Sequence, residues 1–134
     1  MADNKILHIL NMKSIAIVGV SKKLYKPSYK IFRYLNNSGY RTFLVNPNYS
    51  VIDQVECHEN LKAIKSPIEV VNIFRKSEHV LPIIKSAIEL NAKAIWMQDG
   101  VQSKEAYNLA KSNGLFVVMN DCILRQHKKL HSIL

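Results

Sequence analysis

The residues best suited to chemistry are the glycine, serine and lysines that end and follow the first apolar run of the chain, Ser14–Val20. Backbone N–H groups, hydroxyls and ammonium groups are donors that proteins use to bind phosphate. A helix that we expect to begin near Pro27 adds the positive end of its dipole. Arg75, at the end of a later β-branched run, offers a planar guanidinium to the same kind of ligand. The sequence therefore predicts a site for an anionic, phosphate-bearing molecule.

Strand-like and helix-like segments alternate along the chain, which predicts a parallel sheet with helices on both faces. The predicted strands are Ser14–Val20, Arg41–Val45, Gln54–Cys57 as a short edge strand, Val70–Phe74, Ala94–Met97 and Leu115–Met119. The predicted helices are Pro27–Asn37, Ser77–Leu90 and Ser103–Asn113, with one or two helical turns in Glu59–Lys65. Because crossovers in such sheets are right-handed, we expect an α/β fold, a Rossmann-like doubly wound parallel sheet of five to six strands.

Polar residues follow the ends of five of these strands. The five segments are Gly19–Lys23, Asn46–Asn48, Phe74–Ser77, Gln98–Gly100 and Asn120–Cys122. In open parallel sheets, ligands bind beyond the carboxyl ends of the strands, where the winding reverses. We expect this point between the first strand and Val70–Phe74, which would place Ser21 and the nearby lysines opposite Arg75.

Composition indicates an ordinary globular protein, with 134 residues, 48% of them hydrophobic and 22% charged. We expect a single domain over residues 1–134, with an N-terminal extension at 1–12 and a basic C-terminal tail at 124–134. The N-terminus makes a poor signal peptide and no apolar run is long enough to span a bilayer, so we expect no membrane partner and a cytoplasmic location. The formal charge of +9 favours anionic partners.

A nicotinamide dinucleotide fits these residues poorly, although an NAD(P)-type module remains an alternative. The first loop lacks the G-x-G-x-x-G pattern that brings a helix close to a pyrophosphate. The second strand ends in Asn46–Pro47, where an NAD site has an acidic residue for the ribose hydroxyls. There is also no second domain to carry a substrate.

A series of motifs resembles a known family. The segments are IAIVGVS, KPSYKIFRYLNNSGY, LVNP, VVNIFRKSE, AIWMQDGV and VVMNDC. Between Ser14 and His127 they resemble, in order and spacing, the small bacterial CoA-binding proteins of the YccU-like group. Those proteins are related to the nucleotide-binding domain of succinyl-CoA synthetase and of ADP-forming acyl-CoA synthetases. The resemblance implies a Rossmann-like domain that binds coenzyme A (CoA) or acyl-CoA across the strand ends.

The resemblance also implies a set of cofactor-binding residues. The positions that match the family motifs are Gly19, Val20, Ser21, Pro27, Ser28, Asn46, Pro47, Phe74, Arg75, Gln98 and Gly100. Lys22, Lys23 and Lys26 would add point charges around the pyrophosphate and ribose phosphate of CoA. Tyr25 and Tyr49, in loops at the same edge, are candidates for stacking on the adenine.

The chain departs from the family at several positions. Lys26 replaces an arginine, and Asn48 and Asp121 each replace a basic residue, which removes phosphate-binding capacity. Asp99 stands where an apolar residue is common, and we expect it to be exposed or at the mouth of the pocket. These substitutions raise the alternative that the chain has kept the fold and lost the ligand.

No catalytic constellation is evident in the sequence. The histidines are His8, His58, His79, His127 and His131, and we expect all five at the surface. Cys122 lies near the ligand edge, but Asp121 beside it would raise the thiol pKa, so we expect Cys122 and Cys57 to be packed free thiols. Adjacent Cys57 and His58 would point to opposite faces of a strand, which argues against a metal site.

We therefore expect a non-catalytic protein that binds CoA or acyl-CoA as a small-molecule ligand. It would carry or sense that ligand, or regulate through a protein partner or as a homo-oligomer. The alternative class is a basic nucleic-acid-binding domain, suggested by the charge and the tail. It is the weaker alternative because helices cover both faces of a parallel sheet, leaving no exposed aromatic platform.

Overall fold

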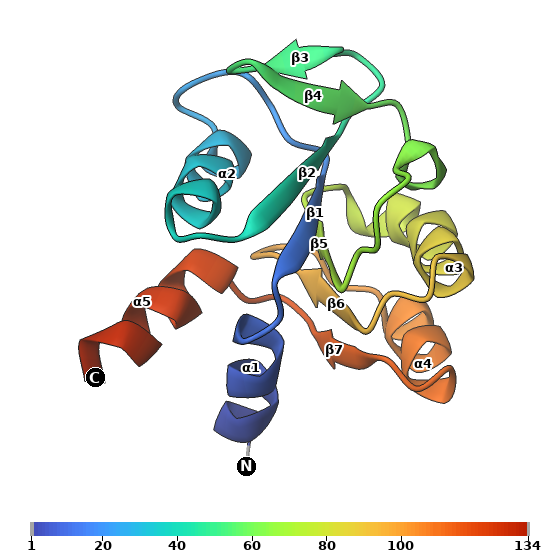
Figure 1. The fold of residues 1–134 in the computed structure, drawn as a ribbon. Helices are drawn as coiled ribbons and strands as arrows, with labels where there is room; N and C mark the ends of the chain where they lie inside the picture. The colour runs from blue at the N-terminus through green and yellow to red at the C-terminus, as the bar shows by residue number, and fades with distance from the viewer. Residues whose placement is uncertain (1, 134) are drawn as a thin grey trace.

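The computed structural model describes residues 2–133. A seven-stranded sheet runs through the molecule in the order β3-β4-β2-β1-β5-β6-β7 (Figure 1). The strands are β1 (Ser14–Val18), β2 (Arg41–Val45), β3 (Val51–Ile52), β4 (Val55–His58), β5 (Val70–Ile73), β6 (Ala94–Met97) and β7 (Phe116–Val118). All neighbouring pairs are parallel except β3 with β4, so the predicted α/β doubly wound sheet is confirmed, with one strand more than expected.

The first strand and the fifth are neighbours at the centre of the sheet. Ile17 of β1 is opposite Leu44 of β2 on one side and Asn72 of β5 on the other. Every residue of β1 is buried, as expected for a strand covered on both faces. The winding reverses between β1 and β5, which confirms the predicted switch point.

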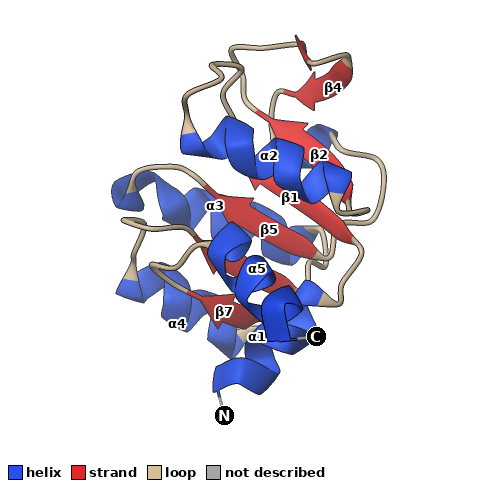
Figure 2. Ribbon diagram, turned by 90° about the vertical axis from the view of Figure 1, so that its left-hand side faces the viewer, coloured by secondary structure: helices blue, strands red, loops and turns tan. Residues whose placement is uncertain are grey.

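Five α-helices cover the two faces of the sheet (Figures 1 and 2). They are α1 (Ala2–Leu10), α2 (Pro27–Asn37), α3 (Val80–Glu89), α4 (Lys104–Ser112) and α5 (Ile123–Ile133). Helices α1, α2 and α5 pack on one face and α3 and α4 on the other, so the prediction of helices on both faces is confirmed.

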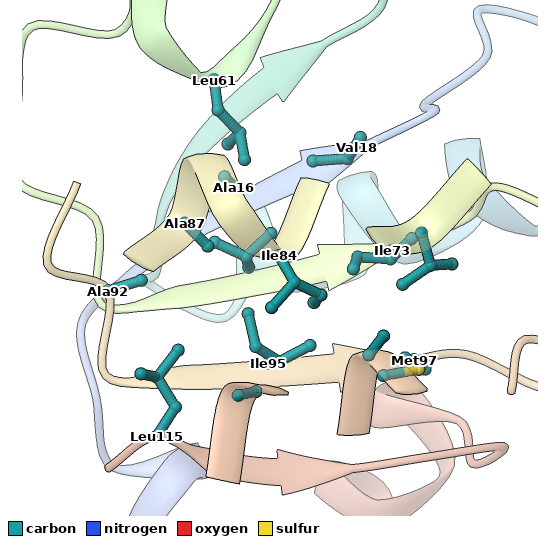
Figure 3. Close-up of a cluster of buried hydrophobic side chains, with 14 of the residues drawn as sticks. Ala16, Val18, Leu61, Ile73, Ile84, Ala87, Ala92, Ile95, Met97 and Leu115 are labelled. Atoms are coloured by element: carbon teal, nitrogen blue, oxygen red, sulfur yellow. The ribbon is translucent and has the colours of Figure 1, made fainter. Parts of the chain in front are cut away.

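Alternation along the strands builds a separate core on each face. Ala16 and Val18 of β1 point towards α3 and α4, where they join Ile73, Ile84 and Ile95 (Figure 3). Ile15 and Ile17 point the other way, towards α2 and α5. Because its side chains alternate between the two faces, β1 lies between two packed layers.

Local signals explain where the helices begin. Pro27 occupies the first turn of α2, where a missing N–H costs nothing. Ser103 caps α4 by accepting a hydrogen bond from Ala106 N at 3.2 Å. Ser77 does not start an α-helix: Ser77–His79 forms a 3-10 turn, and α3 begins at Val80 with Pro82 in its first turn.

The outer elements differ from the expected ones. Residues Val55–His58 form a parallel strand, and the edge is β3, which pairs with it as a short antiparallel hairpin. Asp53 and Gln54 turn this hairpin with positive φ angles of 51° and 67°. A two-residue strand carries too little periodicity to be recognised in a sequence.

Both ends of the described chain are built into the fold. Ile9 and Leu10 at the end of α1 and Met12 after it are buried, with exposed fractions of 1%, 5% and 6%. Residues 124–133 of the predicted basic tail belong to α5, which begins at the buried Ile123. No helix in the described range 2–133 has the length and apolar character needed to cross a membrane.

Tyr40 ties the second strand to the first helix, because its hydroxyl donates a hydrogen bond to the Leu10 carbonyl. Burial raises the pKa of Tyr40 to about 12 from 10.0, with a smaller contribution from Tyr34. The folded state therefore holds this proton more tightly than the unfolded chain does. Stability from this group is complete below pH 10 and is lost as the pH rises through about 12.

We expect alkaline titration, followed by tyrosinate absorbance, to show a late-ionising phenol. Tyr40→Phe should remove that late step and reduce the loss of stability in urea unfolding between about pH 10 and 12. Tyr25→Phe, at an exposed tyrosine, is the control and should leave both unchanged. The pKa values of Tyr29 and Tyr34 are also raised, so the outcome that would contradict this assignment is a latest step whose amplitude is the same in Tyr40→Phe as in the parent.

Candidate functional site

The loop after β1 passes very close to the loop after β5. Gly19 has a φ of +90°, and a Cβ atom at this position would lie 2.7 Å from the Phe74 carbonyl oxygen. Its N–H donates to the Val45 carbonyl at 2.9 Å, and Phe74 N donates to the Val18 carbonyl at 2.8 Å. The single glycine of this loop is therefore required both by its backbone conformation and by the close approach of Phe74.

Two serines shape the rest of the loop. The buried Ser28, in the first turn of α2, accepts a hydrogen bond from Ser21 N at 3.0 Å. Ser21 Oγ in turn accepts from Lys23 N at 3.0 Å. Lys26, at the N-cap of α2, makes no capping hydrogen bond through its side chain. The helix N-terminus is thus left open towards the loop, with its dipole favouring an anion.

Three adjoining hollows lie beyond the carboxyl ends of β1, β2 and β5, and all three are lined by Gly19. The first, about 370 Å³, is lined by Gly19, Ser21, Lys23, Lys26, Pro27, Ser28, Tyr49 and Phe74. The second, about 390 Å³, is lined by Gly19, Asn46, Phe74, Arg75, Lys76 and His79. The third, about 230 Å³, is lined by Val18, Gly19, Val45, Pro47, Glu59, Asn60, Leu61, Arg75, His79, Pro82, Ile83 and Ser86. We call these hollows together the strand-end groove.

The charge of the strand-end groove is mainly positive. Arg75 is half-buried between two of the hollows and forms no hydrogen bond or ion pair with the described residues. Lys23 and Lys26 lie at the start of α2, and Lys76 lies beside Arg75. Glu59 is the one acidic residue among those that line the groove. The groove therefore offers an unpaired guanidinium and several ammonium groups to an anion.

The side chain of Asn46, which directly follows β2, forms hydrogen bonds with backbone groups. Asn46 Nδ2 donates to the Val20 carbonyl at 2.8 Å, and Asn46 Oδ1 accepts from Asn48 N at 2.9 Å. The amide nitrogen therefore joins the two loops, and the amide oxygen stabilises the turn that follows β2. Pro47 lines the apolar hollow beside it. An acidic residue for ribose hydroxyls is absent at this position, as the sequence indicated.

Four of the predicted site residues, Val20, Lys22, Gln98 and Gly100, do not line the three hollows. Val20 is fully buried in the core. Gln98 is 3% exposed, and its Oε1 accepts from Ile123 N at 3.0 Å, which caps the first turn of α5. Gly100 N donates to Asn120 Oδ1 at 2.8 Å in the neighbouring turn. Lys22 instead lies over the ring of Tyr49, 5.5 Å from its centroid, at the rim of the first hollow.

The loop at the end of β6 is held by ion pairs. Arg125 makes two hydrogen bonds to Asp99, at 3.0 and 2.9 Å, and a third to Asp121 at 2.8 Å. Hydrogen bonding to Arg125 lowers the pKa of Asp99 below its ordinary value. Asp121 also accepts from Cys122 N at 2.7 Å, at the start of α5. Asp99 is exposed, as expected, and Asp121 stabilises a helix N-terminus rather than facing the groove.

Sequence reasoning missed the lining contributed by other elements. His79, Ile83 and Ser86 come from the 3-10 turn and helix after β5, and Asn60 and Leu61 come from the turn after β4. These residues could have been predicted from their position in the sequence, because each segment directly follows a strand that ends at the groove. Tyr49 lines the first hollow, whereas Tyr25 is 67% exposed with Lys26 over its ring.

The thiols do not line the groove. Burial raises the pKa of Cys57, whose Sγ lies 3.6 Å from the Asn46 carbonyl oxygen. Cys122 is half-buried and is not disulfide-bonded. Among the side chains that the structure describes, those of residues 4–131, no group of three or more His, Cys, Asp or Glu is placed to hold a metal ion.

Comparison with known sequences gives consistent matches. The family model described as "CoA binding domain" matches residues 13–128. The uncharacterized protein YneT of Bacillus subtilis (strain 168) is 34% identical over 115 residues, which are 86% of this chain and 85% of that protein.

Comparison with solved structures supports the same grouping. A hypothetical protein from Pyrococcus horikoshii OT3 superposes with a TM-score of 0.94 at 32% identity, covering 98% of this chain and 93% of its own. The structure of cell-free ID.343 from Thermus thermophilus gives a TM-score of 0.91 at 27% identity, covering 97% and 99%. The dinucleotide forming acetyl-coenzyme A synthetase 1 of Ca. Korarchaeum cryptofilum shares the fold, with a TM-score of 0.74 at 22% identity over 86% of this chain and 28% of that one.

Proposed function

The chain belongs to the family of CoA binding domains, and we propose that it holds CoA or an acyl-CoA in the strand-end groove and performs no catalysis of its own. The observation that carries the proposed position is Arg75, an unpaired and half-buried guanidinium beside Gly19 at the switch point of the sheet. A guanidinium without an acidic partner at such a point is suited to a phosphate group.

The phosphates of CoA would lie along the polar part of the groove. Lys23 and Lys26 flank the open N-terminus of α2, and Arg75 faces them across Gly19. Gly19 lets the loop after β1 pass against the loop after β5, which brings these charges to one place, and the N-terminus of α2 favours a pyrophosphate between them. Lys76 lies beside Arg75 and is available for the ribose phosphate.

The adenine would occupy the apolar hollow beside the phosphates. Its walls include Val45, Pro47, Leu61 and Ile83. Small-molecule sites are mostly apolar with a few polar groups that fix orientation, and Ser86 is one such group here. The pantetheine arm would then leave along the first hollow, past Phe74 and Tyr49, so that Tyr49 would flank this arm and not stack on the adenine as expected from the sequence.

The absence of catalysis is inferred from the lining of the groove. Its histidine, His79, lies 3.7 Å from Glu78 at the surface, and neither cysteine is among the lining residues. No hydroxyl in the groove accompanies a hydrogen-bonded histidine, the pair that activates a nucleophile. A protein of this kind would act by carrying or sensing its ligand, alone, as a homo-oligomer or through a protein partner.

Calorimetric titration tests the proposal. We expect saturable binding of one CoA or acetyl-CoA per chain, with NAD giving no comparable heat. Dephospho-CoA, which lacks the ribose phosphate, should bind more weakly than CoA because one charge-assisted contact is lost. No binding of either CoA species by folded protein would refute the proposal, and a salt-sensitive shift of nucleic acid in a gel would favour the alternative class.

A further inference from the structure

Another hollow, separate from the strand-end groove, lies at the opposite end of the molecule. In Figure 1, β1 runs away from α1, so the amino ends of β1 and β2 lie at the end where α1 stops. This hollow of about 410 Å³ is lined by Leu10, Asn11, Met12, Lys13, Ser38, Gly39, Tyr40, His127 and His131. None of these residues lines the strand-end groove.

Two histidines of α5 stand side by side at this hollow. His127 and His131 are four residues apart, so they lie on the same face of the helix. Their ring centroids are 4.1 Å apart, and the ring planes are tilted by 37°. Two imidazoles one helical turn apart are suited to bind the same metal ion, as they do on the helices of zinc enzymes.

The inner histidine is fixed in orientation and keeps one nitrogen available. His127 is 7% exposed, so the expected surface position of this histidine is wrong, and its Nδ1 lies 2.6 Å from the Tyr34 hydroxyl of α2. No described residue makes a hydrogen bond with Nε2, on the opposite side of the ring. Metal-binding histidines commonly hold their second nitrogen in this way, which sets the tautomer and the angle of the ring.

The backbone around the hollow also favours a cation. Helix α1 ends at Leu10 and α2 at Asn37, and residues at or just beyond both ends line the hollow. His131 lies in the last turn of α5. The negative ends of these dipoles attract positive charge. Lys13 and the net charge of +9 oppose the binding of a cation, and salt screens that repulsion.

We propose that His127 and His131 chelate a divalent transition metal ion, such as Zn²⁺, Ni²⁺ or Cu²⁺, with Tyr34 positioning the inner imidazole. Imidazole suits these ions, whereas Mg²⁺ and Ca²⁺ require oxygen ligands. Because no third His, Cys, Asp or Glu side chain among those described, residues 4–131, completes the set, water would fill the remaining positions. The site is thus open to a further ligand from solution.

Titration of the untagged, full-length protein with Zn²⁺ and with Ni²⁺ at neutral pH tests the proposal. We expect one equivalent to bind saturably, Mg²⁺ to give no binding, and the Cu²⁺ complex to show two nitrogen ligands in its electron paramagnetic resonance spectrum. His131→Ala changes an exposed residue and should fold normally while binding at least about tenfold more weakly. Tyr34→Phe keeps both ligands and should weaken binding by roughly 10- to 100-fold.

His79→Ala, at an exposed histidine of the other end, is the matched control and should bind as the parent does. Equal Zn²⁺ affinity in the parent and in His131→Ala would overturn the proposal. So would the absence of one-equivalent binding. In nuclear magnetic resonance spectra, the imidazole signals of His127 and His131 should shift with Zn²⁺. If inorganic phosphate shifts these signals and Zn²⁺ does not, the hollow is an anion site and the proposal is wrong.

Discussion

Replacing Gly19 by alanine should destabilise the protein by about 2 to 5 kcal/mol and abolish or strongly weaken CoA binding. The backbone φ of +90° is strained for any residue with a Cβ atom, which accounts for about 1 to 3 kcal/mol. The added methyl group would also lie 2.7 Å from the Phe74 carbonyl oxygen and 3.1 Å from Arg75 Cδ. Relief of that clash requires the β5 loop to move, and Arg75 would move with it.

Urea unfolding and calorimetric titration of the same variant measure the two effects. Gly114→Ala is a matched control, because Gly114 has a φ of +82° with nothing within 4 Å of the added Cβ atom. The control should show the cost of backbone strain alone and should keep the affinity of the parent for CoA. Unchanged stability and affinity in Gly19→Ala would show that the loop tolerates the displacement and that the close approach has no role.

Replacing Arg75 by alanine should weaken CoA binding by roughly 10- to 100-fold with little change in stability. A hydrogen bond to a charged group contributes about 1.5 to 3 kcal/mol, which corresponds to that range of dissociation constants. The guanidinium has no partner among the described residues, so its removal breaks no ion pair of the fold. Arg75→Lys should recover only part of the affinity, because an ammonium group lacks the planar fork.

Calorimetric titration of the parent, Arg75→Ala and Arg75→Lys measures the effect. Arg41→Ala is the control for net charge, since Arg41 is exposed at the amino end of β2, away from the groove. Its affinity should stay within about twofold of the parent. If Arg75→Ala binds CoA as well as the parent does, the proposed position of the ligand is wrong, or the chain has lost the family's ligand.

Much of the fold could be predicted because it depends on local patterns. The apolar run at Ser14–Val18 is buried on both faces, and only a central parallel strand requires that. Pro27 and Ser103 mark helix starts by chemistry that operates within a few residues. The switch point between β1 and β5 then follows from the handedness of the crossovers. The hairpin at β3 was missed because two residues have no recognisable period.

The sequence also determined which residues reach the strand ends, but it did not determine what each one contacts. Asn46 and Gln98 lie at strand ends, as Arg75 does. Their side-chain amides, however, form hydrogen bonds with other segments of the chain. The tertiary structure decided this, because a polar side chain bonds whichever buried donor or acceptor the packing brings within about 3 Å. Arg75 was left without a partner for the same reason.

The sequence by itself therefore determined the sheet, its switch point and the basic character of the loops at the carboxyl ends of the strands, since these follow from periodicity, capping and composition. Only the tertiary structure brought Gly19 against Phe74, left the guanidinium of Arg75 unpaired, and set His127 and His131 beside Tyr34. Those arrangements join segments up to 93 residues apart, as between Tyr34 and His127. Contacts at such separations depend on how the helices pack on the sheet, and no local pattern records them.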